Sequence, residues 1–193
     1  MPELRIAPDV ARSIRLVVLD VDGVLTDGGL YMGATEGGTS VELKRFEITD
    51  GLGIKMMDRA RLHVVLVSGR SSAANRLRAA ELDVPFHEGP GGFKLDIVEE
   101  LQSIQGVDWR ETACVCDDLA DLPIFRRAGL AVAVANAVPE VKAIAHGVTR
   151  RRGGRGAVRE FAEALLRARG QWASLVEAYV SQRDRTREAE GVR

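Results

Sequence analysis

The sequence has few of the residues that would support a zinc site or a redox centre. It contains 2 cysteines and 3 histidines in 193 residues, and aromatic residues make up 5% of the chain. Cys114 and Cys116 have C-x-C spacing, whereas zinc and redox motifs commonly use C-x-x-C. Because they alternate within a predicted buried strand, we expect both to be small core thiols that point to the same face.

Long apolar runs and a strong net charge are also missing. No apolar run approaches the roughly 20 residues that a membrane helix requires, and Glu3, Arg5 and Asp9 interrupt the N-terminal segment where a secretory signal would be apolar. The formal net charge of −1 gives no overall attraction to nucleic acid or to anionic lipid. We therefore expect a cytoplasmic protein whose partner is a small molecule, with no nucleic acid and no membrane involved.

Short apolar runs alternate with segments that have helical spacing. The runs cover residues 16–19, 62–67, 113–116 and 130–134, and the helix-like segments cover 52–61, 73–82, 95–104, 119–127 and 138–145. Runs this apolar are typical of parallel strands that are covered on both faces. The pattern predicts an α/β fold with three layers, a Rossmann-like parallel sheet between two layers of helices.

Two segments depart from this alternation. Residues 28–46 contain two strand-like stretches around a glycine-rich turn, which predicts a β-hairpin inserted after the first strand and too short to form a lid domain. Residues 171–193 begin amphipathic and end in mixed charge, which predicts a C-terminal tail that is partly helical or disordered. Residues 1–170 are then expected to form a single domain.

An aspartate pair, Asp20 and Asp22, directly follows the first apolar run. Burying unpaired carboxylates is costly, so their position at a strand end indicates a metal site, a reactive role, or both. In phosphoryl transfer, Asp20 would be both metal ligand and nucleophile, forming an aspartyl-phosphate. Asp22 would protonate the leaving alkoxide and then deprotonate the attacking water.

Other polar groups follow the later strands, and right-handed crossovers bring the ends of parallel strands to one edge of the sheet. Asp117 is a predicted Mg²⁺ ligand, and Ser68 with Lys94 would hold the phosphoryl group. Each has an alternative: Ser68 can be an ordinary helix cap, and an isolated lysine is usually solvated. Asp118 and Asp121 are equally explained as capping or outer groups beside the metal.

Taken in this order, the residues resemble the haloacid dehalogenase superfamily of phosphatases, over about residues 15–170. Several stretches are similar, within it, to the 3-deoxy-D-manno-octulosonate 8-phosphate phosphatases. They are residues 20–28, Tyr31, 44–46, 49–55, 68–72 and 153–160. The resemblance implies a capless, Mg²⁺-dependent enzyme, a homotetramer, and a product used in lipopolysaccharide synthesis.

The resemblance also implies roles for individual residues. Asp20 would be the nucleophile, Asp22 the acid/base whose backbone carbonyl binds Mg²⁺, and Asp117 the third protein ligand. Substrate contacts, partly across a subunit boundary, would come from cations and from one short segment. Besides Asp22 and Lys94, these predicted substrate-binding residues are Glu47, Ile48, Thr49, Asp50, Gly51, Lys55, Gly69, Arg70 and Arg78. By composition alone, Arg78 would be a solvated helix residue.

Three departures from the family pattern concern the site. Cys116 stands where glycine usually precedes the acidic pair, Ser68 replaces the commoner threonine, and residues 89–93 are glycine-rich where polar residues are common. The alternatives left open are a phosphatase for a nine-carbon keto sugar acid phosphate or another small phosphometabolite, and a non-catalytic binding protein on the same fold. We further expect the hairpin to pack between subunits in place of a lid.

Overall fold

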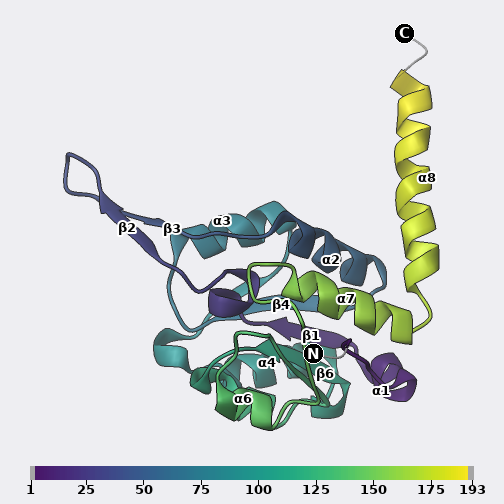
Figure 1. Cartoon of the computed structure of the whole chain (residues 1–193), viewed down its shortest axis with the longest axis horizontal. Coiled ribbons are helices and arrows are strands. Elements are labelled where there is room, and N and C mark those ends of the chain that lie inside the picture. The colour runs from purple at the N-terminus through teal and green to yellow at the C-terminus, as the bar shows by residue number, and fades with distance from the viewer. Residues whose placement is uncertain (1–2, 191–193) are drawn as a thin grey trace.

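The computed structural model describes residues 3–190 and has a six-stranded parallel sheet at its centre (Figure 1). The strands lie in the order β5-β4-β1-β6-β7-β8. Their bounds are β1 Leu16–Leu19, β4 His63–Ser68, β5 Phe86–Glu88, β6 Thr112–Cys116, β7 Leu130–Ala133 and β8 Gly147–Val148. Leu16 pairs in register with His63 on one side and Thr112 on the other, so the ends of β1, β4 and β6 meet at one edge.

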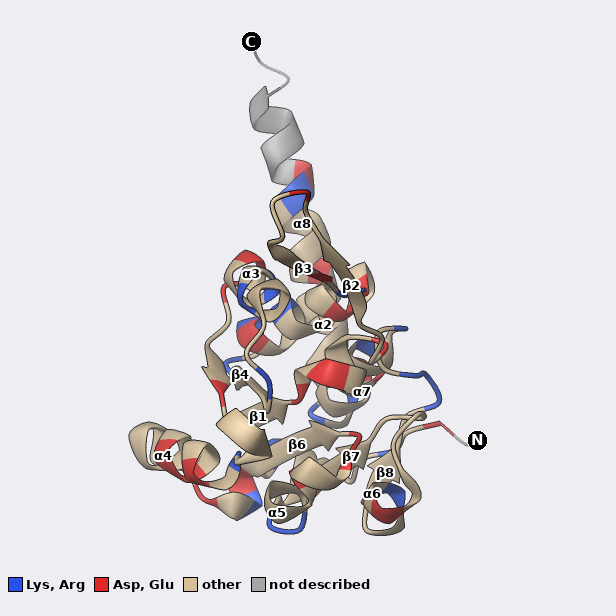
Figure 2. Ribbon diagram, turned by 90° about the vertical axis from the view of Figure 1, so that its left-hand side faces the viewer, with Lys and Arg blue, Asp and Glu red and all other residues tan. Residues whose placement is uncertain are grey.

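Helices cover both faces of the sheet (Figures 1 and 2). One layer contains α2 (Ile48–Arg59), α3 (Ala73–Leu82) and α7 (Ala157–Ala168), and the other contains α4 (Leu95–Gln105), α5 (Leu122–Phe125) and α6 (Pro139–Ala143). The central strands β1, β6 and β7 are buried along their whole length. The predicted three-layer α/β fold with a parallel sheet is therefore confirmed.

Helix α1 (Pro8–Ser13) precedes the sheet, and α8 (Trp172–Glu190) follows α7 and extends away from the body (Figure 1). Trp172 at the start of α8 is buried, and α7 contacts α8. The predicted tail thus includes a helix, and residues 191–193 of that prediction lie outside the described residues. In the part of the chain that is described, no helix combines the length and apolarity of a membrane span.

The hairpin expected within residues 28–46 is present. Its strands are β2 (Tyr31–Ala34) and β3 (Ser40–Leu43), paired antiparallel with Tyr31 opposite Leu43. The hairpin projects from the sheet layer (Figure 1), and the bridge between Thr26 and Phe46 closes its base. Its strands leave large apolar side chains exposed, among them Tyr31, Met32 and Leu43.

The structure differs from the predicted elements in a few places. The predicted helix over residues 119–127 is a 3₁₀ turn (Leu119–Asp121) followed by the short α5. Pro123 in the first turn of α5 lacks a backbone N–H, so the chain breaks into two turns there. Strands β5 and β8 were not expected, because two or three residues give no periodic pattern. Cys114 and Cys116 are free, buried thiols, as predicted.

Candidate active site

A tight turn directly after β1 separates the side chains of Asp20 and Asp22. Within the turn over Val21–Leu25, Gly23 has φ 102°, a left-handed conformation that favours glycine. The hydroxyl of Thr26 accepts hydrogen bonds from the backbone N–H groups of Gly23 and Gly28 at 3.1 and 3.2 Å. This buried threonine therefore fixes the turn from inside.

Asp20 shares one buried lysine with Asp121. Lys94 Nζ lies 2.5 Å from Asp20 Oδ1 and 2.5 Å from Asp121 Oδ1, and all three side chains are almost fully buried. Burial raises the pKa of Asp20 to about 7, an effect that Lys94 partly offsets and Asp121 reinforces. Burial lowers the pKa of Lys94, but the carboxylates of Asp20 and Asp121 more than compensate and raise it, so the lysine is charged.

Asp117 completes an acidic cluster with Asp20 and Asp121. One ligand atom from each of the three residues lies within 4.8 Å of the others. Burial first, and then the charges of Asp20 and Asp121, raise the pKa of Asp117 to about 8. Its buried Oδ1 has no hydrogen-bond partner among residues 3–190. Three carboxylates around one lysine carry excess negative charge, and an unpaired buried oxygen is costly, so this donor set fits a hard divalent cation such as Mg²⁺.

Glycines and one asparagine hold the Asp20 turn against Asp117. A Cβ atom at Gly23 would lie 2.0 Å from Asp117 Oδ2, and a Cβ atom at Gly153 would lie 1.8 Å from the carbonyl oxygen of Gly23. Asn136 links the two segments, because its side chain donates to Gly23 O at 2.8 Å and accepts from Gly153 N at 2.6 Å. Gly153 and Gly154 thus let their segment pass close to the turn after Asp20, whose Gly23 lies against Asp117.

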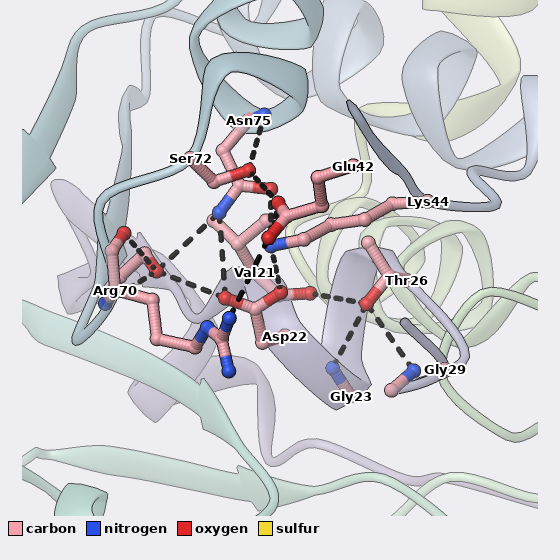
Figure 3. Close-up of polar contacts among 12 residues, drawn as sticks. Val21, Asp22, Gly23, Thr26, Gly29, Glu42, Lys44, Arg70, Ser72 and Asn75 are labelled. Carbon is pink, nitrogen blue, oxygen red and sulfur yellow. Dashed lines mark hydrogen bonds and ion pairs between the residues drawn. The ribbon is translucent and has the colours of Figure 1, made fainter. Parts of the chain in front are cut away.

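The carboxylate of Asp22 lies in a different set of contacts (Figure 3). Lys44 Nζ donates to Asp22 Oδ1 at 2.5 Å, and Ser68 Oγ and Asn75 Nδ2 donate to Asp22 Oδ2 at 3.0 and 3.3 Å. Ser68 comes from the end of β4 and Asn75 from the first turn of α3. The turn after β1 therefore sends its two carboxylates to two different groups of partners.

Glu42 joins the hairpin to this second group of contacts. It accepts a hydrogen bond from Ser72 Oγ at 2.6 Å and lies 3.5 Å from both Lys44 Nζ and Arg70 Nη2 (Figure 3). The hydrogen bond from Ser72 is the main reason that the pKa of Glu42 is lowered. Arg70 has an exposed side chain at the end of β4, where Gly69 brings the backbone close to Gly92.

The other predicted substrate-binding residues lie around the start of α2. Ile48 and Thr49 are exposed there, and Arg78 reaches across from α3 to donate to Glu47 O at 3.3 Å. Gly51 leaves room for Arg78, since a Cβ atom there would lie 2.8 Å from Arg78 Nη2. The guanidinium also lies 5.7 Å from the centre of the Phe46 ring. Arg78 is therefore half enclosed by the 46–51 segment and is not a freely solvated helix residue.

Asp50 and Lys55 point into the protein. Asp50 is 0% exposed, and its carboxylate accepts from the N–H groups of Gly156 and Arg159 at 3.3 and 2.7 Å, at the first turn of α7. Burial raises the pKa of Asp50 to about 6, although these backbone hydrogen bonds lower it. Lys55 donates to the carbonyl oxygen of Leu82. In the single subunit both residues hold the 47–51 segment and α2 in place.

The three departures from the family pattern leave the cluster intact. Cys116 is buried at the end of β6, and burial raises the pKa of its thiol well above the usual value. Gly91 and Gly92 both have positive φ, in the loop that leads to Lys94. Phe93 is 80% exposed in this loop.

Asp118 is exposed and caps Leu119 N at 2.7 Å, so Asp121, and not Asp118, joins the acidic cluster.

Comparison with known proteins decides the family. A model for haloacid dehalogenase-like hydrolases matches residues 90–160. The 3-deoxy-D-manno-octulosonate 8-phosphate phosphatase of Escherichia coli K12 is 40% identical over 161 residues, which cover 83% of this chain and 84% of that protein. The chain therefore belongs to the 3-deoxy-D-manno-octulosonate 8-phosphate phosphatase family. It is a phosphatase of the haloacid dehalogenase-like type.

Solved structures agree with this assignment to the phosphatase family. The enzyme of this name from Moraxella catarrhalis, in complex with a magnesium ion, a phosphate ion and a KDO molecule, has a TM-score of 0.82 and 32% identity, covering 89% of this chain and 97% of that one. A cobalt-bound deoxy-D-mannose-octulosonate 8-phosphate phosphatase from Haemophilus influenzae has a TM-score of 0.75 and 39% identity, with 83% and 92% covered. Metal ions thus occur in phosphatases of this fold.

Three polar residues of the phosphatase site were not assigned a role from the sequence. Lys44 and Asn75 contact Asp22, and Asn136 holds Gly23. The spacing of Asp121, one helical turn after Asp117, predicts that it joins the acidic group there as a cap or outer residue, and the structure places it in the cluster itself. Nothing in the local pattern marks Asn75, because its role depends on how α3 meets the hairpin.

Proposed function

We propose that this phosphatase hydrolyses 3-deoxy-D-manno-octulosonate 8-phosphate with Mg²⁺ as its cofactor. One observation carries the proposal: the two aspartates after β1 have different partners. Asp20 lies beside Lys94 and the acidic cluster, whereas Asp22 accepts hydrogen bonds from other residues, among them Ser68. The substrate assignment is supported by relatives that carry this name and are 40% identical over most of the chain.

Asp20 is the proposed nucleophile. Its carboxylate attacks phosphorus, the bond from phosphorus to the sugar oxygen breaks, and an aspartyl-phosphate forms. Lys94, charged and 2.5 Å from Asp20, offsets the repulsion between the carboxylate and the phosphate dianion. Ser68 supplies a hydroxyl at the end of β4, beside the backbone N–H groups that begin the next segment, and would receive phosphoryl oxygens.

Asp22 is the proposed proton shuttle. It gives a proton to the departing sugar oxygen and later takes one from the water that hydrolyses the aspartyl-phosphate. Asp20, the backbone carbonyl of Asp22 and Asp117 would hold Mg²⁺, with Asp121 beside them. When bound, the cation supplies positive charge that offsets the charge of the phosphate and of the cluster.

The sugar acid end of the substrate is proposed to meet cations outside the metal cluster. The groups proposed for this contact are the side chains of Arg70, Arg78 and Lys55 and the backbone of Gly69 and of the 47–51 segment. A carboxylate binds an arginine fork through two parallel hydrogen bonds, so these arginines suit its acidic end. We further propose a homotetramer with the hairpin between subunits, which would bury the exposed apolar side chains of its strands, and a cytoplasmic location.

A phosphate-release panel tests the function. It comprises eight- and nine-carbon keto sugar acid phosphates, hexose phosphates and nucleotides, each assayed with Mg²⁺ and after chelation. We expect the eight-carbon ester to have the highest kcat/KM and chelation to abolish release until Mg²⁺ is restored. Equal kcat/KM on all esters, or preference for a nine-carbon ester, would contradict the substrate, and no release at all would favour a non-catalytic binding protein.

A further inference from the structure

We propose that Lys44 and Asn75 are positioning residues that hold the Asp22 carboxylate for proton transfer. We call Lys44 and Asn75, with their contacts to Asp22, the Asp22 clamp. The hairpin would then form part of the active site of its own subunit, in addition to any contact between subunits. The inference rests on the proposed role of Asp22 as the acid/base.

Lys44 has few alternatives to its contact with Asp22. Its side chain is 0% exposed, and its ammonium lies 2.5 Å from Asp22 Oδ1, 3.1 Å from Asn75 Oδ1 and 3.5 Å from Glu42 Oε1. A buried ammonium group is strongly destabilising unless acceptors surround it. These three acceptors therefore fix its place, and the shortest contact goes to Asp22.

Asn75 uses both ends of its amide on the same group of residues. Its oxygen accepts from Lys44, while its nitrogen donates to Asp22 Oδ2 at 3.3 Å and lies 3.4 Å from Ser68 Oγ (Figure 3). Asn75 is 1% exposed, so water cannot readily replace these partners. The donor and acceptor ends are matched to their neighbours, and a leucine of similar size would satisfy none of them.

Glu42 and Ser72 join the two elements that carry the Asp22 clamp. Ser72 caps α3 by accepting from Asn75 N at 3.3 Å, and it also donates to Glu42 on β3 at 2.6 Å. Strand β3 thus lies against the start of α3, and Lys44 follows that strand directly. Both oxygens of Asp22 are held, one by the hairpin and the other by α3 and β4.

An acid/base must lie within hydrogen-bond reach of the atom it protonates, in the correct direction. Without the Asp22 clamp, Ser68 is the one described side chain that still donates to Asp22, through Oδ2 alone, so the carboxylate can turn away from the productive direction. Substrate binding should then change little, whereas both proton transfers should slow. This predicts a loss in kcat with little change in KM, which distinguishes a positioning residue from a substrate contact.

The test compares Lys44→Met and Asn75→Leu with Lys142→Met, a lysine substitution on α6 outside the site. The assays use the sugar acid phosphate, which has a poor leaving group, and p-nitrophenyl phosphate, whose leaving group needs no proton. For the sugar ester we expect each variant to lose about 10–100-fold in kcat, less than the roughly 100–10,000-fold contribution of an acid/base itself, because Asp22 is still present. With the aryl ester we expect a rapid burst of nitrophenolate followed by slow turnover, because only the second step needs Asp22.

A double-mutant cycle makes the test independent of folding defects. In an Asp22→Asn background, Lys44→Met should cost less than about threefold more, since the group that it positions is already gone. Full additivity would overturn the proposal, as would a raised KM with unchanged kcat, or equal losses on both esters without a burst. If the wild-type protein prefers another alkyl phosphate, that ester takes the place of the sugar ester, so failure of the proposed substrate is seen separately.

Discussion

Asp20 and Asp22 are separated by one residue and yet lie in two different electrostatic environments. Asp20 shares Lys94 with Asp121 and stands in an acidic cluster with Asp117, and burial raises its pKa to about 7. Asp22 instead has Lys44, Ser68 and Asn75 around it. Two carboxylates with one residue between them can therefore have separate partners, and Gly23, directly after Asp22, turns the chain in a left-handed conformation that brings its backbone against Asp117.

The largest effect is expected from Gly23→Ala, which disturbs the acidic cluster around Asp20. The new Cβ atom would lie 2.0 Å from Asp117 Oδ2, so the turn and the metal ligand have to separate. A displacement of about 1 Å at reacting groups can cost about 100-fold in rate, and we expect at least that loss in kcat/KM together with weaker Mg²⁺ activation. Steady-state assays with Mg²⁺ titration provide the measurement.

Gly38→Ala is the matched control for Gly23→Ala. Gly38 also has positive φ, at 77°, but it lies at the hairpin turn with no atom within 4 Å of the added Cβ among the described residues. It therefore carries the same type of backbone strain without the contact to Asp117. Equal losses in the two variants would show that strain alone, and not the metal cluster, explains the effect.

A smaller effect on the same acidic cluster is expected from Asp121→Asn. Asp121 contacts Lys94 at 2.5 Å and accepts from Asp117 N at 3.4 Å. Removal of a group that orients metal ligands typically costs about 10–100-fold in metal affinity or activity, and we expect a loss of this size, measured as Mg²⁺ activation. Asp118→Asn, on the exposed neighbour that only caps Leu119, should stay near wild type. A reversed order would assign the metal role to Asp118.

The smallest effect should come from Asp50→Asn, which touches neither aspartate of the comparison. Burial raises the pKa of Asp50 to about 6, so the folded protein binds a proton more readily than the unfolded chain. The contribution of Asp50 to the wild-type free energy of unfolding should then fall as pH rises from about 4 to about 6, by about 1–3 kcal/mol, in addition to the contributions of Asp20 and Asp117, whose pKa values are also raised. Asp50→Asn should lack this component, while Asp58→Asn, on an exposed residue of α2, should keep it.

Urea unfolding at pH 4.5, 5.5 and 7 measures this difference between the Asp50 and Asp58 variants. A parallel pH dependence in the wild-type protein and Asp50→Asn would contradict the assignment. The activity of the same Asp50→Asn variant shows whether the 47–51 segment contacts the substrate. A raised KM would support a substrate contact through this segment, and an unchanged KM would leave Asp50 with its capping role on α7.

The strand ends were predictable because parallel strands share one carboxyl edge. That rule brings Asp20, Ser68 and Asp117 together from segments far apart in the sequence, and Lys94 follows from the need for a balancing cation. The hairpin and the central strands were likewise visible as local patterns.

The Asp22 clamp was not predictable in the same way. Lys44 and Asn75 lie in the hairpin and in α3, and their contact depends on Glu42 and Ser72 joining those elements, which no local period reports. The broken helix after Asp118 has a local cause, since Pro123 interrupts the apolar spacing that predicted one continuous helix. Short edge strands such as β8 depend on neighbours for their hydrogen bonds and leave almost no trace in the sequence.

Trapping of the covalent intermediate tests the division of labour between Asp20 and Asp22 most directly. The Asp22→Asn variant is mixed with p-nitrophenyl phosphate and Mg²⁺, quenched in acid and digested, and its peptides are weighed by mass spectrometry. We expect one added phosphoryl group on Asp20, and none when Asp20→Asn is combined with Asp22→Asn. A phosphoryl group on Asp117 or on any other residue of the Asp22→Asn variant would contradict the assignment of Asp20 as the nucleophile.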